Sequence, residues 1–142
     1  MTFAESSESV ENVNELQMGT AFTYPNALAL SNVEVASLFH SRFEKHQKII
    51  EDNPSGSHLP HLFNDAMLYA DRFAGVDTHH LSSIQHFRST LLTRQFDPYE
   101  IASLINLQPD TIEEALDLLP SLARFQHFEI DEALTELRNA IS

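Results

Sequence analysis

The sequence contains no cysteine, only three glycines and few basic residues. Without cysteine it has no disulfide, no thiolate metal ligand and no cysteine nucleophile, which is compatible with a reducing compartment. Eight Lys and Arg against 21 Asp and Glu give a net charge of −13, so autonomous binding to nucleic acid or to an anionic membrane is not expected. No apolar run approaches membrane-spanning length, and no basic-then-apolar secretory signal opens the chain. The scarcity of glycine and of β-branched clusters favours helices.

Residue patterns typical of catalysis or metal binding are also missing. The sequence has no Gly-rich phosphate loop, no nucleophile elbow and no Asp-rich calcium loop. Among eight histidines, His58 and His61 flank a proline in an expected loop, while His79 and His80 would point about 100° apart on a helix. Neither spacing favours zinc. The sequence therefore predicts no catalytic, cofactor or metal site and a protein that is not itself an enzyme.

The stretch 96–122 predicts two short helices with well-marked ends. Asp97 with Glu100 and Thr111 with Glu114 have the spacing of capping boxes. Each cap is followed by an apolar stripe, formed by Ile101, Leu104 and Ile105 in the first helix and by Ile112, Ala115, Leu118 and Leu119 in the second. A DNA-reading helix-turn-helix has similar lengths, but this stretch is acidic and lacks Lys and Arg, so phosphates would repel it. A helical hairpin that caps a small core is expected.

Composition divides the chain into three parts. Residues 1–15 hold four glutamates, three serines and no basic residue, and we interpret them as a disordered acidic tail, with or without a regulatory role. Residues 16–30 are too apolar for a free tail and too short for a sheet, so they predict an extended arm that docks on a partner or on the chain's own helices. Residues 31–142 predict one all-α domain.

The longest expected helix runs from Ser31, capped with Glu34, to Ile50. Its apolar residues span an arc of about 160°, whereas a single contact needs about 100°. We therefore expect two contacts: one with the domain's own core through Ala36 and Phe43, and one with a second protein. The apolar arc is made up of Val35, Ala36, Leu38, Phe39, Phe43, Ile49 and Ile50. Arg42 falls inside it, either lying along the helix or meeting a carboxylate of the partner.

Three further helices follow from apolar periodicity. The first spans 62–73, the second begins at Asp77 or Thr78 and reaches about Arg94, and the third closes the chain. Their expected inward residues are Leu62, Phe63, Ala66, Met67, Ala70 and Phe73 in the first, Leu81, Ile84, Phe87, Leu91 and Leu92 in the second, and Ile130, Ala133, Leu134, Leu137 and Ile141 in the third.

Several ordered motifs resemble one known family. The run 106–115, Asn-Leu-Gln-Pro-Asp-Thr-Ile-Glu-Glu-Ala, with Pro-Ser-Leu at 120–122, resembles the C-terminal signature of the fourth subunit of RNA polymerase II, which has a relative in the archaeal polymerase. The pattern Leu-x-Met-Gly-x-x-Phe at 16–22 resembles that family's N-terminal segment, and Tyr-Ala-Asp-Arg-Phe at 69–73 resembles its second helix. The resemblance covers about 16–141.

This resemblance implies a small helical (HRDC-like) domain with an extended arm, acting as a non-catalytic stalk subunit of nuclear DNA-directed RNA polymerase II. Members of the family form a heterodimer with the seventh subunit, which carries an oligonucleotide-binding barrel, and join the polymerase core. They support transcription initiation and handle nascent RNA only indirectly, through the partner. The residues we expect at the partner interface are Leu16, Met18, Phe22, Leu28, Leu30, Val35, Leu38, Arg42 and Ile49.

The family pattern is not complete. Residues 123–128 replace a usually acidic stretch, which puts any family contact through them in doubt. The equivalent subunit of RNA polymerase III, or of a plant-specific polymerase, shares the first-helix match and remains an alternative. A free-standing helical adaptor, monomeric on its own, is the alternative from a different class.

Overall fold

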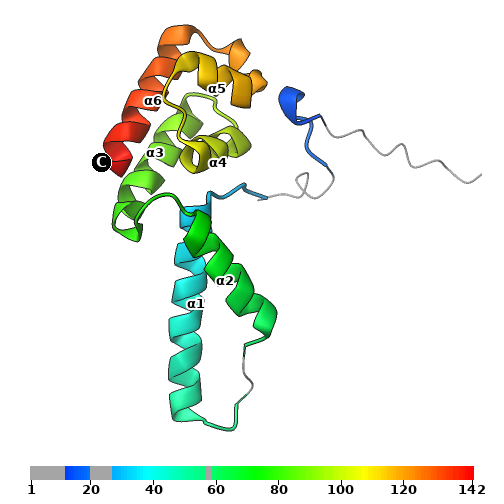
Figure 1. Cartoon of the computed structure of the whole chain (residues 1–142), viewed down its shortest axis with the longest axis vertical. Coiled ribbons are helices and arrows are strands. Elements are labelled where there is room, and N and C mark those ends of the chain that lie inside the picture. Colours follow the sequence, from blue (N-terminus) through cyan, green and yellow to red (C-terminus); the bar gives the residue numbers. More distant parts are fainter. Residues whose placement is uncertain (1–11, 20–26, 57–58) are drawn as a thin grey trace, which may run out of the picture.

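A computed structural model of the chain describes residues 12–19, 27–56 and 59–142 (Figure 1). All regular elements in these ranges are helices, which confirms the all-α prediction. The 3-10 turns are η1 (Val13–Glu15), η3 (Thr78–His80) and η4 (Pro120–Arg124), and the α-helices are α1 (Asn32–Asp52), α2 (His61–Phe73), α3 (Leu81–Thr93), α4 (Pro98–Leu107), α5 (Ile112–Leu118) and α6 (His127–Ile141). Helices α3 to α6 form a bundle, and α1 and α2 form a hairpin that projects from it (Figure 1).

Local capping sets most of these boundaries. Asp97 and Glu100 form the expected reciprocal capping box at the start of α4. At the start of α5 only half of the expected box forms. Thr111 Oγ1 accepts the Glu114 N–H at 3.1 Å, but the Glu114 carboxylate accepts the Asp110 N–H at 3.0 Å rather than that of Thr111. Both arrangements satisfy donors that a helix N-terminus would otherwise leave unpaired.

The core of the bundle lies between α3, α4 and α6. The stripes predicted for α4 and α6 face it, which confirms their periodicity. Its fully buried members are Ile84, Leu91, Ile101, Leu104, Ile105, Leu122, Ile130, Leu134 and Leu137, with Phe87 and Ala115 beside them and Val33 contributed by α1. A continuous apolar core of this kind is the main favourable contribution to folding.

Two residues expected to face the core lie at its edge instead. Leu92 is 39% exposed because the buried face of α3 is centred on Ile84 and Leu91, with Arg88 between them. Leu118 is also exposed, while Leu119, the residue that follows the helix, is buried. Periodicity places both leucines on an apolar arc without showing how far the covered part of that arc extends.

The described N-terminal residues form a compact turn. Asn12 and Gln17 exchange two backbone hydrogen bonds, of 3.0 and 2.9 Å, around η1, and Leu16 adopts a left-handed conformation with φ of 57°. This turn lies against η4. Residues 12–15, which composition assigns to the acidic tail, thus belong to an ordered turn, and residues 1–11 lie outside the described residues.

Candidate partner interface

The hairpin of α1 and α2 has its own thin core. Helix α1 starts at the predicted capping box of Ser31 and Glu34, and its N-terminal turns meet the bundle. Farther along, the two helices hold each other through buried Ala36 and Ala70 and through the rings of Phe39 and Phe63, which meet edge to face at 5.1 Å. Phe43, predicted to be core, is only half-buried here. The distal hairpin therefore depends on few contacts outside itself.

The two sides of this hairpin differ in polarity. On one side His40 of α1 and Asp71 of α2 pair at 2.7 Å. Leu38 and Tyr69 each precede a member of that pair by two residues, a rotation of about 200° around the helix axis. Leu38 and Tyr69 therefore lie on the side opposite the His40–Asp71 contact, and both are about 60% exposed.

Of the nine residues predicted at the interface, four form one stripe along α1. Leu38 and Ile49 are 60% and 58% exposed, Arg42 is exposed, and Val35 is half-buried near the bundle. No described residue of the chain covers the outer part of this stripe. Apolar side chains this exposed along one helix face are typical of a binding surface.

The remaining predicted residues lie elsewhere. Leu28 is exposed and Leu30 is half-buried in the extended segment before α1, and Phe22 lies outside the described residues. Leu16 and Met18 are half-buried and, with Ala27, Ala29, Asp97, Pro98 and Tyr99, line a shallow groove of about 450 Å³ at the start of α4. The described ends of the arm thus lie against the chain's own helix, and the structure does not bring Leu16 and Met18 to the α1 stripe.

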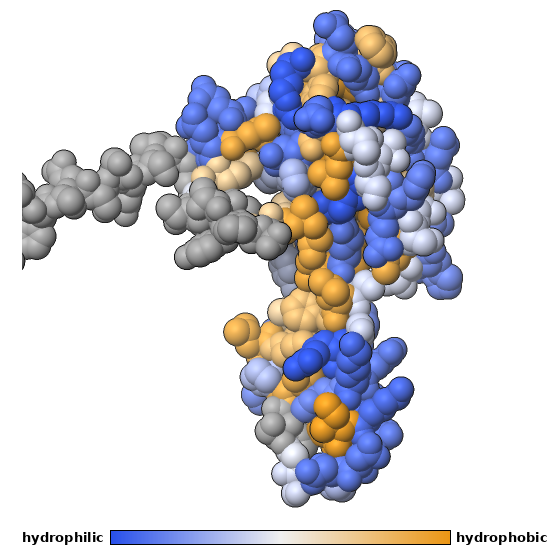
Figure 2. All heavy atoms as spheres, turned by 180° about the vertical axis from the view of Figure 1, so that it is seen from behind, coloured by the Kyte–Doolittle hydropathy of each residue, from blue (hydrophilic) through white to orange (hydrophobic). Residues whose placement is uncertain are grey.

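Helix α2 adds residues that sequence reasoning assigned wrongly. Leu62 and Phe73 were expected to face inward, yet they are 76% and 48% exposed. With Tyr69 they form one edge at spacings of seven and four. The Tyr69 and Phe73 rings approach to 4.7 Å, and the Arg72 guanidinium lies 5.7 Å from the Phe73 ring centre. The width of the apolar arc, which identified the outer stripe of α1, is the signal that would have found this edge. Exposed apolar residues therefore line this side of the hairpin, part of which is visible in Figure 2.

Polar contacts hold the base of the hairpin to the bundle. The Asn32 N–H donates to Asn106 Oδ1 at 2.8 Å, and the Asn32 side chain donates to the Phe73 carbonyl at 3.1 Å. Beside them Arg88 of α3 donates to both carboxylate oxygens of Glu34, at 3.0 and 2.7 Å, with both side chains buried. We call these contacts the neck. Asn106 opens the signature run, so the signature contributes directly to the position of the hairpin.

Basic side chains of the bundle are engaged within the bundle or at the neck. Arg94 pairs with Glu136, Arg124 pairs with buried Glu100, Arg88 pairs with Glu34, and Arg138 donates to a backbone carbonyl. The hydrogen bond to the Glu100 side chain raises the pKa of the Arg124 guanidinium above its ordinary value. The other four Lys and Arg residues are all on the hairpin: Arg42, Lys45, Lys48 and Arg72.

A smaller charge pair marks the entry to α3. The Asp77 side chain caps η3 by accepting the His79 N–H at 3.0 Å and also meets the His79 ring. The side-chain hydrogen bond lowers the pKa of Asp77 and raises that of His79. The pair therefore favours the folded state between the unfolded-state pKa values of 3.8 and 6.5 and loses its effect outside that window, as Asp77 protonates or His79 deprotonates.

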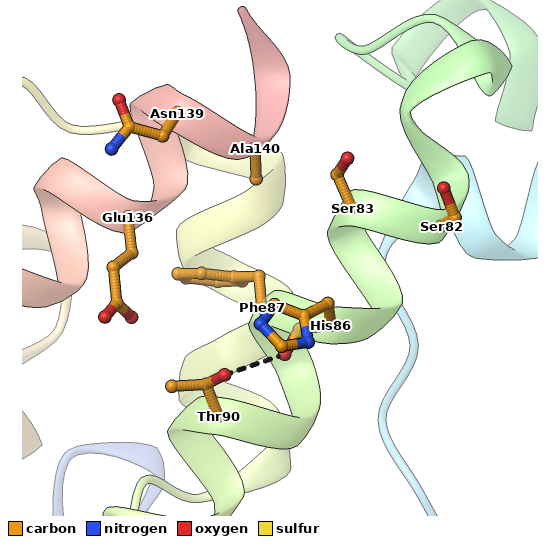
Figure 3. Close-up of a pocket in the computed structure, with 8 residues that line it drawn as sticks. All are labelled: Ser82, Ser83, His86, Phe87, Thr90, Glu136, Asn139 and Ala140. Atoms are coloured by element: carbon orange, nitrogen blue, oxygen red, sulfur yellow. Dashed lines mark hydrogen bonds between the residues drawn. The ribbon is translucent and has the colours of Figure 1, made fainter.

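A polar hollow lies between α3 and α6 (Figure 3). It has a volume of about 520 Å³ and is lined by Ser82, Ser83, His86, Phe87, Thr90, Glu136, Asn139 and Ala140. The Thr90 hydroxyl donates to the His86 carbonyl, a bond within the helix. No described serine or threonine donates to a histidine ring, as a nucleophile–base pair would require. Within the described ranges, no three His, Asp or Glu side chains are grouped to hold a metal, and none of the helices is long and apolar enough to cross a membrane.

The fold defines a class, a small helical bundle with a projecting helical hairpin. The sequence profile of the family described as RNA polymerase Rpb4 matches residues 29–141, which cover α1 to α6. DNA-directed RNA polymerase II subunit 4 of Arabidopsis thaliana is 31% identical over 137 residues, 96% of this chain and 95% of that protein. DNA-directed RNA polymerase II subunit rpb4 of Dictyostelium discoideum is 31% identical over 125 residues, 80% of this chain and 79% of that protein. The chain belongs to the RNA polymerase Rpb4 family, which confirms the resemblance seen in the signature.

Proposed function

We propose that this chain is the non-catalytic stalk subunit of a nuclear DNA-directed RNA polymerase II. In this proposal it forms a heterodimer with the seventh subunit, joins the polymerase core and supports transcription initiation. Family membership and two relatives named as polymerase II subunits support the polymerase class. The single structural observation that supports a protein partner is the one-sided apolar face of the hairpin.

The exposed α1 stripe suits a protein–protein contact. Leu38 and Ile49 lie on the same face of α1, three turns apart, and the exposed aromatic edge of α2 lies on the same side of the hairpin. Aromatic residues and arginine are enriched at protein interfaces, and they frequently carry most of the binding energy. A partner laid across both helices would cover residues from each.

Charge separates the proposed role from direct RNA binding. The chain carries a net charge of −13, and the basic residues of its bundle are already engaged. Phosphate contacts need free Lys and Arg, which supply most of the non-specific affinity for nucleic acid. The subunit therefore acts as a scaffold, with RNA contacted through the partner's barrel.

Replacing Leu38 with aspartate should reduce affinity for the seventh subunit by roughly 30-fold or more, because the new carboxylate would be buried unpaired at the interface. The domain should stay folded, since Leu38 is 60% exposed in the free chain. Partner affinity by calorimetry and the unfolding midpoint in denaturant are the two measurements. Gln47→Asp adds the same charge at an exposed position of α1, about 160° around the helix from Lys45, and should bind normally. If Leu38→Asp binds as tightly as the wild type, the stripe is not the interface.

Deleting residues 1–23 should abolish or greatly weaken the heterodimer while leaving the helical circular dichroism signal nearly unchanged. The deletion removes Leu16, Met18 and Phe22, the apolar residues of the predicted arm. A shortened chain that keeps full partner affinity would contradict the docking role of the arm. Loss of thermal stability with unchanged affinity would instead show that the arm serves only the chain's own α4, where Leu16 and Met18 lie.

Purification of a tagged chain at high salt tests the whole proposal. The seventh subunit of polymerase II should co-purify in equal amount, followed at lower salt by core subunits. Recovery of polymerase III subunits, or of the plant-specific enzyme, would reassign the chain within its class. A monomer that is soluble on its own and carries no polymerase subunit would indicate the adaptor alternative.

A further inference from the structure

The outer stripe of α1 carries positive charges that the helix itself does not neutralise. On a helix, side chains three and four residues apart are neighbours. Around Arg42 these neighbours are Leu38, Phe39, Lys45 and His46, and around Lys45 they are Ser41, Arg42, Lys48 and Ile49. None is a carboxylate. Neither cation forms an ion pair with any described residue. Two uncompensated cations therefore sit side by side on an otherwise strongly acidic protein.

These cations occupy the centre of a regular seam. Val35, Leu38, Arg42, Lys45 and Ile49 follow one another at spacings of three, four, three and four residues. This is the heptad spacing with which helices pack against one another in coiled coils. In such a seam a charged residue costs stability but selects the partner and its alignment. Exposed Leu38 and Ile49 thus provide apolar contacts on either side of a central pair of positive charges.

The position of these charges disfavours pairing between two copies of the chain. In an antiparallel pair that sets Leu38 against Ile49, Arg42 of each copy falls opposite Lys45 of the other. In a parallel pair each cation faces its own counterpart. Like charges placed directly opposite repel, so both arrangements are penalised.

We propose that Arg42 and Lys45 determine the specificity of this seam, and that its occupant is a protein surface with apolar residues flanking a pair of carboxylates. The proposal rests on the proposed function, because that occupant is a surface of the stalk partner. Charge complementarity supports it, because free cations coincide with exposed leucine and isoleucine on this seam. An acidic partner would neutralise Arg42 and Lys45, whereas a second copy of the chain would not. Phosphates of RNA would form ion pairs with Arg42 and Lys45 but would make no apolar contact with Leu38 and Ile49.

The first experiment measures affinity for the seventh subunit against salt. Arg42→Glu/Lys45→Glu should weaken binding by roughly tenfold or more. Raising the salt concentration should weaken wild-type binding, because attraction is screened, and strengthen binding of the double variant, because repulsion is screened. Lys48→Glu, the same change outside the seam, should leave both affinity and salt dependence close to wild type. Wild-type affinity in the double variant would overturn the proposal while leaving the proposed heterodimer intact.

The second experiment needs no partner and therefore separates the two proposals. In the antiparallel self-pair, Arg42→Glu alone places a carboxylate of each copy opposite Lys45 of the other copy, so each dimer gains two attractive contacts. Its self-association constant, measured by analytical ultracentrifugation, should rise roughly tenfold over the wild type. Adding Lys45→Glu restores like charges and should remove the gain. Equal self-association in all three proteins would overturn the seam assignment. The proposal would also be overturned if the wild type bound a short RNA, the double variant did not, and both proteins bound the seventh subunit with equal affinity.

Discussion

Replacing Arg88 with methionine is expected to lower the free energy of unfolding by about 3–5 kcal/mol. The change leaves the buried Glu34 carboxylate without the guanidinium that donates to both of its oxygens. Ser31 still donates its hydroxyl to Glu34 at 2.7 Å and its backbone N–H at 3.4 Å, but two neutral donors do not offset a buried charge. Because small domains are stable by only about 5–15 kcal/mol, a loss of this size is readily measured by denaturant unfolding.

Two controls separate this effect from a general loss of arginine. Arg94→Met removes a guanidinium at the end of the same helix, where the pair with Glu136 is about one-third exposed, and should cost at most about 1 kcal/mol. Adding Glu34→Gln to Arg88→Met removes the unpaired charge and should recover most of the lost stability. If Arg88→Met alone cost less than about 1 kcal/mol, the neck pair would not hold the hairpin as described.

Replacing Arg124 with methionine is expected to cost about 3 kcal/mol, near the lower limit for breaking a buried pair. Glu100 is fully buried, and Arg124 donates to it and to the carbonyls of Gln95 and Ser121. The cost stays near that limit because Glu100 keeps the Ser121 hydroxyl at 2.6 Å and the Asp97 N–H at 2.9 Å.

The geometry of the Arg124 guanidinium allows a second substitution, to lysine, to be predicted as well. Its central carbon lies 4.3 Å from the Phe125 ring centre, and that ring stacks on Phe96 at 4.1 Å. Lysine keeps the charge but has no planar fork for two carboxylate oxygens and a ring face. Arg124→Lys should therefore fall between wild type and Arg124→Met in denaturant unfolding. Equal stability of the lysine variant and wild type would show that charge alone matters at this position.

Local signals in the sequence predicted the helices well. Asp97 with Glu100 and Ser31 with Glu34 marked helix starts that the structure places at those caps. These signals succeed because a cap involves residues only three apart, so the geometry that satisfies the backbone donors is written in a short stretch of chain. The core stripes of α4 and α6 were predictable for a related reason, since periodicity depends on the helix alone.

The neck and the Glu100 cluster could not be predicted in the same way. Glu34 and Glu100 were fully explained by capping, and nothing near them in sequence indicates a second role. Their cationic partners, Arg88 and Arg124, lie 54 and 24 residues farther along the chain. Residues 123–128, where the chain departs from the family pattern, therefore supply Arg124, the cationic partner of buried Glu100. Pairing over such separations depends on how the helices pack, and that packing is determined by many residues together rather than by a short local motif.

The same limit applies to the candidate interface. The width of the apolar arc on α1 predicted a second contact, and the structure leaves Leu38 and Ile49 exposed. For α2 the arc was interpreted as entirely inward, and the exposed positions of Leu62 and Phe73 show that interpretation to be wrong. A helix shows which residues share a face, whereas the edge of the buried region depends on the neighbouring helix.

The projecting hairpin also acts as a lever. With 21 residues, α1 is about 30 Å long, and the neck holds it near one end. By simple geometry, a tilt of about 10° at the neck would displace the far end by about 5 Å, more than the length of a hydrogen bond. Small rearrangements around Asn106 or Arg88 would thus be magnified at Ile49. Whatever binds along the hairpin depends for its alignment on a handful of polar contacts at the other end of the rod.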